Sequence, residues 1–290
     1  MILLLGGQGY VGQAIHQSLT AAGLSCRVIS RSSVDYSQRD ELVKLLKDSR
    51  ASFLINAAGY TGKPNVDACE IHRTECLAGN AVLPGIIRAA CEITETPWGH
   101  VSSGCIFTGA KPDGSGFSEV DPHNFSFRQN NCSFYSGCKA LGEEVLEGAE
   151  NCFIWRLRIP FNHVDGPRNY ISKMMRYDRL LVATNSLSHL DEFANCCVAS
   201  WTQRIPFGVY NLTNPGSVTT RDVIRLIQKH GLSNKSFQFF DSEDQFLKFA
   251  AKTPRSNCVL DSSKAVAAGL PLSPIEEALE ESMRRFSLGS

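Results

Sequence analysis

Four residues in two short segments could carry proton chemistry together. Tyr135 and Lys139 form a Y-x-x-x-K pattern, and Ser103 and Cys105 stand two apart in VSSGCIFTG. Residues four apart on a helix project from one face, and a nearby ammonium lowers the pKa of a phenol. Such a tyrosine can exchange a proton with a carbonyl oxygen, and Ser103, at the end of a strand, could hydrogen-bond the same oxygen. The pattern predicts acid–base chemistry at a carbonyl.

Alternating strands and helices must position these residues. Residues 2–5 form a continuous apolar strand, which is typical of a strand buried on both faces. After a glycine-rich turn, Val11, Ile15 and Leu19 repeat at helical spacing. The alternation continues through expected strands at 52–59, 98–104 and 152–159 and expected helices at 40–49, 80–92 and 135–148. It predicts an α/β fold with a Rossmann-type doubly wound parallel sheet.

The sequence changes character after residue 160, where a turn-rich loop begins. We expect residues 1–160 to form a dinucleotide-binding domain that is rejoined by about 191–212. Residues 161–190 and 213–290 then form a smaller mixed α/β C-terminal lid that binds substrate. Within the lid, threonines cap a helix at 219–231, and a capping box from Ser273 to Glu276 begins a last helix at 274–286.

Glycines between the first strand and the first helix predict a cofactor site. Gly6, Gly9 and Gly12 give G-x-x-G-x-x-G, in which the backbone can approach a pyrophosphate at a helix N-terminus. A plain tight turn is the alternative for this motif taken alone, and the strand–helix context favours the cofactor. The predicted contacts in this turn come from Gly6, Gln8, Gly9, Tyr10, Val11 and Gly12.

The end of the second strand selects the cofactor. NAD enzymes usually place an acidic residue there for the ribose 2′-hydroxyl, but this chain has Arg31 among Ser30, Ser32 and Ser33. A guanidinium and hydroxyls suit a 2′-phosphate. The segment therefore predicts NADPH rather than NADH, with a solvated surface arginine as the alternative.

Composition limits the possible partners. The 290 residues carry a formal net charge of zero, which indicates no nucleic acid and no anionic membrane surface. The apolar start MILLLGG is too short to span a bilayer and lacks the leader and cleavage site of a signal peptide. The 11 cysteines show no C-x-x-C pair or zinc-like spacing. They suit free thiols in a reducing compartment, so we expect a cytoplasmic protein without a metal site.

The motifs together resemble a known superfamily. The glycine turn, NAAG at 56–59, Ser103 and the Y-x-x-x-K pattern occur in the order found in extended short-chain dehydrogenase/reductases. That resemblance places Asn56, Ala57 and Ala58 beside the cofactor, with Tyr135 and Lys139 also in contact with it. The chain is more specifically similar to the nucleotide-rhamnose synthase/epimerase-reductase family, and more distantly to dTDP-4-dehydrorhamnose reductase. This likeness rests on TGKPNVDACE, SGCIFTG, SFYSGCKALGEEVL, PRNYISK, NLTNPG and PRSN.

The resemblance implies an activity and a set of roles. Family members convert UDP-4-keto-6-deoxy-glucose to UDP-β-L-rhamnose by epimerising C3 and C5 and reducing C4 with NADPH. Cys105 matches a cysteine that a related epimerase-reductase has two residues after its strand serine, which makes it the candidate base, and Lys173 matches the family lysine proposed as the partner acid. A cation near the thiol would help it act as base, and we expect Lys173 to supply it. A packed core thiol and a solvated helix lysine are the alternatives.

Further residues carry weaker signals. The loop after NAAG faces the sugar in this superfamily, which makes Lys63 and Asn65 candidate substrate ligands, with a structural turn as the alternative. Arg168, Asn169 and Arg255 could hold the nucleotide diphosphate or its sugar, because guanidinium pairs well with phosphate; salt bridges inside the lid are the alternative. Related reductases often pair through the tyrosine-bearing helix, so a homodimer is expected.

Two other functions remain open from the sequence. The loop NFSFRQNNCSF before Tyr135 is longer than the family pattern and leaves room for a C4 reductase or a single-site epimerase acting on another nucleotide deoxy-sugar. A non-catalytic, cofactor-binding regulatory subunit is an alternative of a different class. The presence of Ser103, Cys105, Tyr135 and Lys139 together favours an enzyme.

Overall fold

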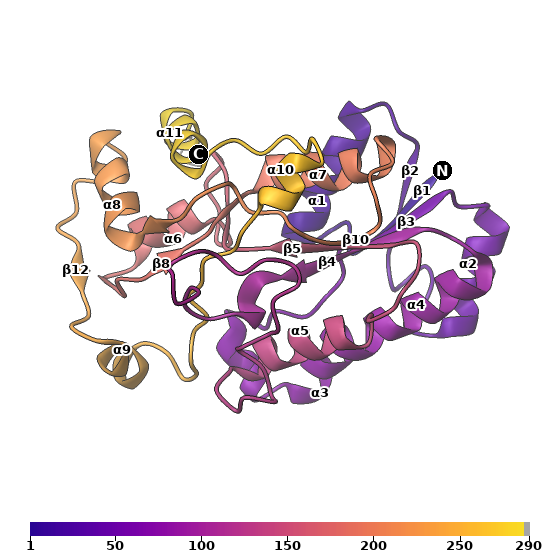
Figure 1. Ribbon diagram of the computed structural model, residues 1–290, viewed down its shortest axis with the longest axis horizontal. Coiled ribbons are helices and arrows are strands. Elements are labelled where there is room, and N and C mark those ends of the chain that lie inside the picture. The colour runs from indigo at the N-terminus through magenta and orange to yellow at the C-terminus, as the bar shows by residue number, and fades with distance from the viewer. Residues whose placement is uncertain (287–290) are drawn as a thin grey trace.

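Six parallel strands form the central sheet of the computed structural model, which describes residues 1–286. The order is β2-β1-β3-β4-β5-β10, so the chain reverses its direction of travel between β1 and β3. This topology confirms the predicted doubly wound α/β fold (Figure 1). The strands are β1 Ile2–Leu5, β2 Cys26–Ile29, β3 Phe53–Asn56, β4 Trp98–Ser103, β5 Cys152–Leu157 and β10 Gly208–Asn211.

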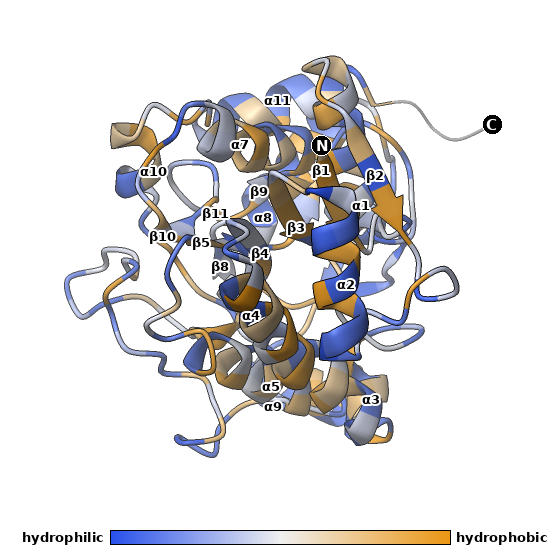
Figure 2. Cartoon of the chain, turned by 90° about the vertical axis from the view of Figure 1, so that its right-hand side faces the viewer, coloured by the Kyte–Doolittle hydropathy of each residue, from blue (hydrophilic) through white to orange (hydrophobic). Residues whose placement is uncertain are grey.

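Helices cover both faces of this sheet. On one face lie α1 (Tyr10–Ala21) and α7 (Leu190–Thr202), and on the other lie α2 (Arg39–Ser49), α4 (Leu83–Thr94) and α5 (Phe134–Glu144). Each layer closes its own apolar cluster against the sheet. Helix α2 illustrates why such a cluster forms: Figure 2 shows hydrophobic and hydrophilic residues alternating along its length. Its leucines are buried against the sheet, and its charged residues are exposed. Helix α7 was not expected from the sequence.

One helical stretch passes the length and composition test for a membrane span. It runs from Arg73 to Thr94 through α3 (Arg73–Leu77), the π-helix η2 (Ala78–Val82) and α4, and half of its most apolar window is buried in the protein. Ile87, Ala90 and Cys91 from α4 pack in the core beneath the sheet. Core helices commonly pass the same test, so the stretch is weak support for a membrane partner.

The lid has a core of its own, which gathers Phe161, Leu187, Ile224 and Leu279 among others. Short strand pairs frame it: β6 (Pro160–Phe161) with β9 (Ser188–His189), β8 (Thr184–Asn185) with β11 (Val218–Thr219), and β7 (Arg179–Leu180) with β12 (Gln238–Phe239). Its helices are α6 (Tyr170–Arg176), α8 (Thr220–Lys229), α9 (Glu243–Phe249) and α11 (Ile275–Arg284).

The division of the chain at 160, 191 and 212 remains a proposal. The pairing of β10 with β5 supports it, because residues 208–211 return to the main sheet. Helix α10 (Ser263–Ala267) complicates it: Ala265 and Leu270 fall in the range expected for the lid but pack in the core on the α1 and α7 side. Residues 287–290 of the predicted lid lie outside the described residues.

The two predicted helix caps have different outcomes. Thr219 forms a complete capping box with Asp222 at the start of α8, as expected. The capping box predicted from Ser273 to Glu276 is wrong. Pro274 is the N-cap of α11 without a side-chain bond, because the Ser273 hydroxyl and backbone N–H both donate to Glu192 on α7. A long-range carboxylate has replaced the local one.

Candidate active site

The glycine turn lies at the carboxyl edge of the sheet, beside the point where the strand order reverses. Gly6 has φ +72°, and a Cβ there would lie 2.5 Å from the backbone nitrogen of Ala58. A Cβ on Gly12 would lie 2.1 Å from the Gly6 carbonyl oxygen. Side chains are thus excluded where β1, β3 and α1 meet.

The start of α1 is open to an anion. Gly9 is the N-cap, no side chain in residues 1–286 caps the helix, and its first turn holds no acidic residue. Free N–H groups at a helix N-terminus favour a phosphate. The cradle that a Cβ would fill and the uncapped helix therefore fit the pyrophosphate of a dinucleotide.

Asn56 fixes the neighbouring turn after β3. Its buried side chain accepts from the Ala58 N–H at 3.0 Å and donates to His100 Nδ1 at 2.9 Å. Burial, aided by Lys139, lowers the pKa of His100 to about 3, so the ring is neutral and can accept this bond. The segment 56–58 is thus held against Gly6. Sequence reasoning did not single out His100, which is one of seven histidines in the chain and lies in an apolar strand.

Arg31 follows β2 and is exposed. Its guanidinium lies 5.6 Å from the centroid of the Tyr36 ring, and within the described chain it forms no salt bridge. Ser30 bonds both Ser32 and Ser33 through its hydroxyl. The segment presents one positive charge and a group of hydroxyls, which matches the surface that the sequence predicted for a 2′-phosphate.

Helix α5 carries Tyr135 and Lys139 on one face, at the end of β4. Lys139 is buried and its Nζ donates to the Val101 carbonyl at 3.4 Å. Burial is the largest cause that raises the pKa of Tyr135 well above its usual value, and a bond to Ser103 opposes it. The structure brings together the predicted trio of Ser103, Tyr135 and Lys139. The prediction that Lys139 gives a lowered phenol pKa is wrong for the protein alone.

Asn80 is a second positioning residue that sequence reasoning missed. It lies in η2, and π-helical turns are frequent at functional sites. Its amide donates to the Tyr60 carbonyl at 2.7 Å and accepts from the Tyr60 N–H at 3.2 Å. A Cβ on Gly59 would lie 3.0 Å from this amide and 3.6 Å from Lys139 Nζ. Asn80 thus holds the loop after β3 close to Lys139; an asparagine in an apolar helical run was the available signal.

Cys105 lies in the short 3-10 turn η3 (Gly104–Ile106), directly after β4. It is buried, and its N–H donates to the Ser103 hydroxyl at 3.2 Å. Burial is the largest cause that raises the pKa of its thiol, and hydrogen bonds and two cations offset part of this rise. The cations are Arg158 and Lys139. The prediction that Lys173 supplies the charge beside this thiol is therefore replaced by Arg158 and Lys139.

Lys173 lies on α6 in the lid and is half-buried. Burial and the charge of Arg168 lower its pKa, which makes it a better proton donor than an exposed lysine. Arg168 itself donates to the Thr61 hydroxyl at 2.7 Å. This contact joins the lid to the loop after β3, in the region where the sequence predicted the sugar.

A second contact joins the same two parts. Arg255 forms an ion pair of 2.7 Å with Asp67, and Thr253 also bonds this carboxylate. Burial opposes ionisation of Asp67, but Arg255 and Thr253 hold its pKa below the usual value. Arg255 was predicted as a substrate ligand with a salt bridge as the alternative, and the salt bridge is what the protein alone forms. Lys63 is exposed on this loop.

Two predicted substrate ligands are committed to the backbone. Asn65 caps the 3-10 helix η1 (Val66–Glu70) by accepting from the Asp67 N–H at 2.8 Å. Asn169 is fully buried, caps α6, and donates to the carbonyls of Asn162 and Val164. We therefore assign Asn65 to the turn and Asn169 to the lid loop, and the prediction that Asn169 holds the nucleotide diphosphate or its sugar is corrected.

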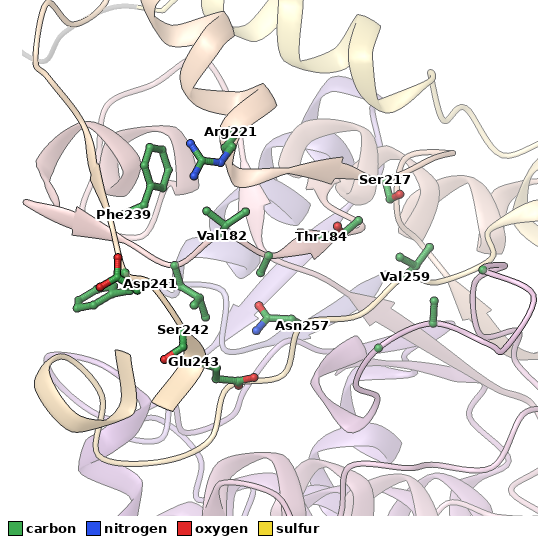
Figure 3. A pocket seen from close by; sticks show the side chains of 16 residues that line it. Val182, Thr184, Ser217, Arg221, Phe239, Asp241, Ser242, Glu243, Asn257 and Val259 are labelled. Atoms are coloured by element: carbon green, nitrogen blue, oxygen red, sulfur yellow. The ribbon is translucent and has the colours of Figure 1, made fainter. Parts of the chain in front are cut away.

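A cavity of about 750 Å³ lies between the lid and residues 109–114 of the segment that follows η3 (Figure 3). Leu181 to Thr184, Phe239 to Glu243 and Asn257 contribute to its wall, with Arg221 at its edge. Ser103, Cys105, Tyr135 and Lys139 are not among its lining residues within 1–286. The reactive groups lie instead at the carboxyl edge of the sheet.

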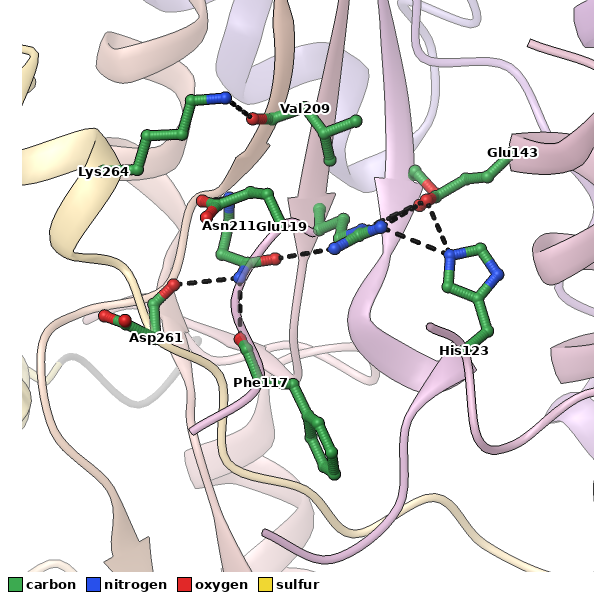
Figure 4. Close-up of polar contacts among 10 residues, drawn as sticks. Phe117, Glu119, His123, Glu143, Val209, Asn211, Asp261 and Lys264 are labelled. Carbon is green, nitrogen blue, oxygen red and sulfur yellow. Dashed lines mark hydrogen bonds and ion pairs between the residues drawn. The ribbon is translucent and has the colours of Figure 1, made fainter. Parts of the chain in front are cut away.

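A buried polar network anchors α5 to the sheet (Figure 4). Glu143, two turns after Tyr135, forms an ion pair of 2.8 Å with Arg156 of β5 and contacts His123 at 3.2 Å. Arg156 also donates to Asn211 of β10 at 3.4 Å. Burial opposes ionisation of Glu143, but Arg156 and His123 hold its pKa well below the usual value. The network fixes the helix that carries Tyr135 and Lys139.

The extended loop before Tyr135 folds back over α5. Arg128 pairs with Glu144 at 2.7 Å, and a Cβ on Gly137 would lie 2.3 Å from the Phe127 ring. At the start of this loop, Asn124 exchanges two hydrogen bonds with the backbone of Thr108. The longer loop is thus packed against the helix and the segment after η3.

The fold and the site define a Rossmann-type reductase of the short-chain dehydrogenase/reductase class. The model of the RmlD substrate binding domain family matches residues 1–288. The chain belongs to this family.

Similar proteins agree with this assignment. A bifunctional dTDP-4-dehydrorhamnose 3,5-epimerase/dTDP-4-dehydrorhamnose reductase of Arabidopsis thaliana is 32% identical over 282 residues, which cover 96% of this chain and 90% of the relative. The UDP-rhamnose synthase of Acanthamoeba polyphaga mimivirus has the same fold, with a TM-score of 0.89 and 23% identity over 98% of this chain and 99% of the other. A dTDP-4-dehydrorhamnose reductase of Bacillus anthracis, solved with NADP, gives a TM-score of 0.79 at 17% identity over 98% of this chain and 97% of the other.

Proposed function

We propose that this protein is an NADPH-dependent nucleotide-sugar 3,5-epimerase/4-reductase that converts a nucleotide-linked 4-keto-6-deoxy-glucose to the β-L-rhamnose form. Membership of the RmlD family and the names of the similar enzymes support the reaction class. The observation that carries the bifunctional form is the position of Cys105, buried in the turn directly after Ser103 and beside the Tyr135 helix. A simple reductase has no use for a thiol base at this point.

The epimerase step uses the acidity of carbons beside a ketone. The Cys105 thiolate takes the proton from C3 or C5 to become a thiol, and the electron pair moves into an enolate at the C4 oxygen. The Lys173 ammonium returns a proton to the opposite face and becomes the neutral amine. Lys173 suits the role of acid because its pKa is lowered by burial and Arg168.

The reductase step uses the α5 residues. NADPH, when bound, supplies a hydride to C4. Tyr135 donates its phenol proton to the C4 oxygen, Ser103 holds that oxygen, and the Lys139 ammonium stabilises the phenolate that remains. Burial lowers the pKa of Lys139, while the negative charge of Glu143 and nearby thiolates oppose the fall.

The cofactor and substrate contacts are part of the proposal. NADPH would lie along the Gly6–Gly12 turn and Asn56–Ala58, with its 2′-phosphate at Arg31; the similar reductase solved with NADP supports this choice. Lys63, Arg168 and Arg255 would face the nucleotide diphosphate, with Arg255 exchanging Asp67 for phosphate. UDP is the carrier favoured by the family resemblance, which also favours a homodimer. A reducing cytoplasm suits the eleven free cysteines.

The direct test is incubation of the purified protein with NADPH and the UDP-linked or dTDP-linked 4-keto-6-deoxy-glucose. The product is identified by NMR, with Tyr135→Phe as the control that binds cofactor but cannot protonate the C4 oxygen. A nucleotide L-rhamnose from the wild type is the expected product. A D-configured 6-deoxyhexose would leave only the reductase, and no turnover with either carrier would contradict the proposal.

A further inference from the structure

Arg158 is a buried arginine without a carboxylate. It follows β5 directly and is 5% exposed. Within residues 1–286 no acidic side chain lies at salt-bridge distance from it, and its buried Nε has no hydrogen-bond partner. Its terminal nitrogen donates to Asn185 Oδ1 at 2.6 Å and to the Ser256 carbonyl, both of which are neutral. Charged groups are rarely buried unless they are paired, so this charge needs an explanation.

The side chain lies against the turn that carries Cys105. A Cβ on Gly104 would lie 3.2 Å from Arg158 Cδ, and the Cys258 thiol donates to the Gly104 carbonyl at 3.3 Å. The turn η3 thus rests on the arginine and on the strand-like segment that the arginine holds. Only a residue without a side chain fits at 104.

The backbone next to Arg158 is strained. Ile159 has φ +38°, a region that β-branched residues rarely adopt. Such outliers cluster at functional sites, where the surrounding structure enforces them. Here the unusual backbone lies between β5 and β6, immediately after the arginine that reaches η3.

We propose that Arg158 is a positioning residue of the epimerase step: its uncompensated guanidinium shapes the Gly104–Ile106 turn and supplies the positive charge that allows Cys105 to act as a base. This rests on the proposed function, because only the epimerase step needs the thiolate. The neutral partners follow from the role. A carboxylate in place of Asn185 would cancel the charge that the thiolate needs.

Other titratable groups approach Cys105 from neighbouring parts of the described chain. Helix α5 presents Tyr135 and Lys139, and the loop before it presents Cys132. The segment that Arg158 holds presents Cys258, whose thiol contacts the Gly104 carbonyl. Burial raises the pKa of the Cys105 thiol, and Arg158 is the first of the two cations that oppose the rise. Removal of Arg158 leaves Lys139 as the remaining cation, so the pKa should move further upward.

The test measures the thiol itself, independently of turnover. Alkylation of Cys105 by iodoacetamide is followed by mass spectrometry of its peptide from pH 6 to 11 (about the range around a free thiol). Arg158→Gln should raise the alkylation midpoint by about one pH unit, which leaves roughly tenfold less thiolate below it. Arg158→Lys keeps the charge and should keep the midpoint close to the wild-type value. Arg128→Gln, an exposed arginine paired with Glu144 on the outer face of α5, is the matched control and should leave the midpoint unchanged.

A second variant covers the case in which Arg158→Gln does not fold. Asn185→Asp keeps the arginine and places a carboxylate 2.6 Å from it in nearly the same shape, and should raise the midpoint in the same direction. In both variants deuterium exchange at C3 and C5 of the substrate in D₂O should slow by about tenfold at a pH below the midpoint.

The outcomes separate this proposal from the function on which it rests. An unchanged alkylation midpoint in Arg158→Gln or Asn185→Asp would mean that Arg158 has only a structural role, and would overturn the proposal. If Cys105→Ala still inverts C3 and C5, the thiol is not the base and the proposed epimerase role fails, whatever the midpoint shows. A raised midpoint together with slowed exchange supports both.

Discussion

Arg156 and Arg158 lie two residues apart along one stretch of chain, and their surroundings differ sharply. Both are buried, at 2% and 5% exposure. Arg156 shares its charge with Glu143 and His123, and its guanidinium lies 5.2 Å from the centroid of the Phe107 ring. Within the described chain, the guanidinium of Arg158 donates hydrogen bonds only to neutral oxygens, and its side chain packs against Gly104.

The end of β5 and the residue that follows it therefore serve two purposes at the same site. Glu143 is on the helix of Tyr135 and Lys139, so its ion pair with Arg156 fixes that helix against the sheet. The charge of Arg158 is left uncancelled next to Cys105, where a thiolate would form. A buried charge that is paired holds structure, and one that is unpaired remains available to chemistry.

The largest predicted effect is on the paired arginine. Glu143→Gln leaves Arg156 buried and uncompensated, so we expect the free energy of unfolding to fall by about 3–5 kcal/mol. Urea unfolding at pH 7 measures it. The double variant Glu143→Gln/Arg156→Gln should recover part of the loss, because no charge is then stranded. A loss below about 1 kcal/mol, the usual value of an exposed pair, would show that the network does not anchor α5.

The same pair predicts a dependence on pH. The pKa of Glu143 is lowered in the folded protein, so its stabilisation is present above the ordinary glutamate value of about 4.3. It is lost as pH falls through the lower folded value. The difference in unfolding free energy between the wild type and Glu143→Gln should therefore shrink steadily below about pH 4. A constant difference down to pH 3 would contradict the assignment.

A smaller loss of stability is expected at the unpaired arginine. Arg158→Gln removes bonds to the neutral Asn185 and Ser256 without stranding an opposite charge, so we expect about 1–3 kcal/mol. The same urea experiment compares it with Glu143→Gln. A loss equal to or above that of Glu143→Gln would break the distinction between a structural and a functional cation.

A third arginine extends the comparison to the surface. Arg31 is exposed, so Arg31→Ala should leave unfolding in the absence of cofactor within about 0.5 kcal/mol of the wild type. It should reduce the preference for NADPH over NADH by roughly tenfold, because charge-assisted bonds to a 2′-phosphate are lost. Fluorescence titration with both cofactors measures the preference. An unchanged ratio would remove Arg31 from the cofactor site.

Local patterns predicted the parts of the site that lie within one element or one turn. The Gly6–Gly12 turn and the pair Tyr135 and Lys139 depend on spacing along the chain, and the structure forms both as expected. The strand–helix alternation predicted the doubly wound parallel sheet for the same reason. The sequence did not predict helix α7, because its run LDEFANCCVASWT is apolar on most sides and so shows no clear helical period.

Side-chain contacts between distant segments could not be predicted from the sequence, for a physical reason. Asp67 and Arg255 meet across 188 residues, and Glu192 takes the bond that Ser273 was expected to give its own helix. Neither spacing nor composition encodes which partner wins such a competition. In the sequence, Arg158 is simply one of two arginines in RLRIPF. Its burial and its neutral hydrogen-bond partners, which distinguish it, are visible only in the structure.

We propose that one site inverts the sugar through Cys105 and reduces it through Tyr135. This proposal is tested most directly by NMR of the reaction in D₂O with the wild type and Cys105→Ala. The wild type should carry deuterium at C3 and C5 of a nucleotide L-rhamnose. Cys105→Ala should lose the deuterium at both carbons, while residual C4 reduction gives a D-configured 6-deoxyhexose. Deuterated L-rhamnose from Cys105→Ala at the wild-type rate would contradict the claim and leave the thiol as a packed core residue.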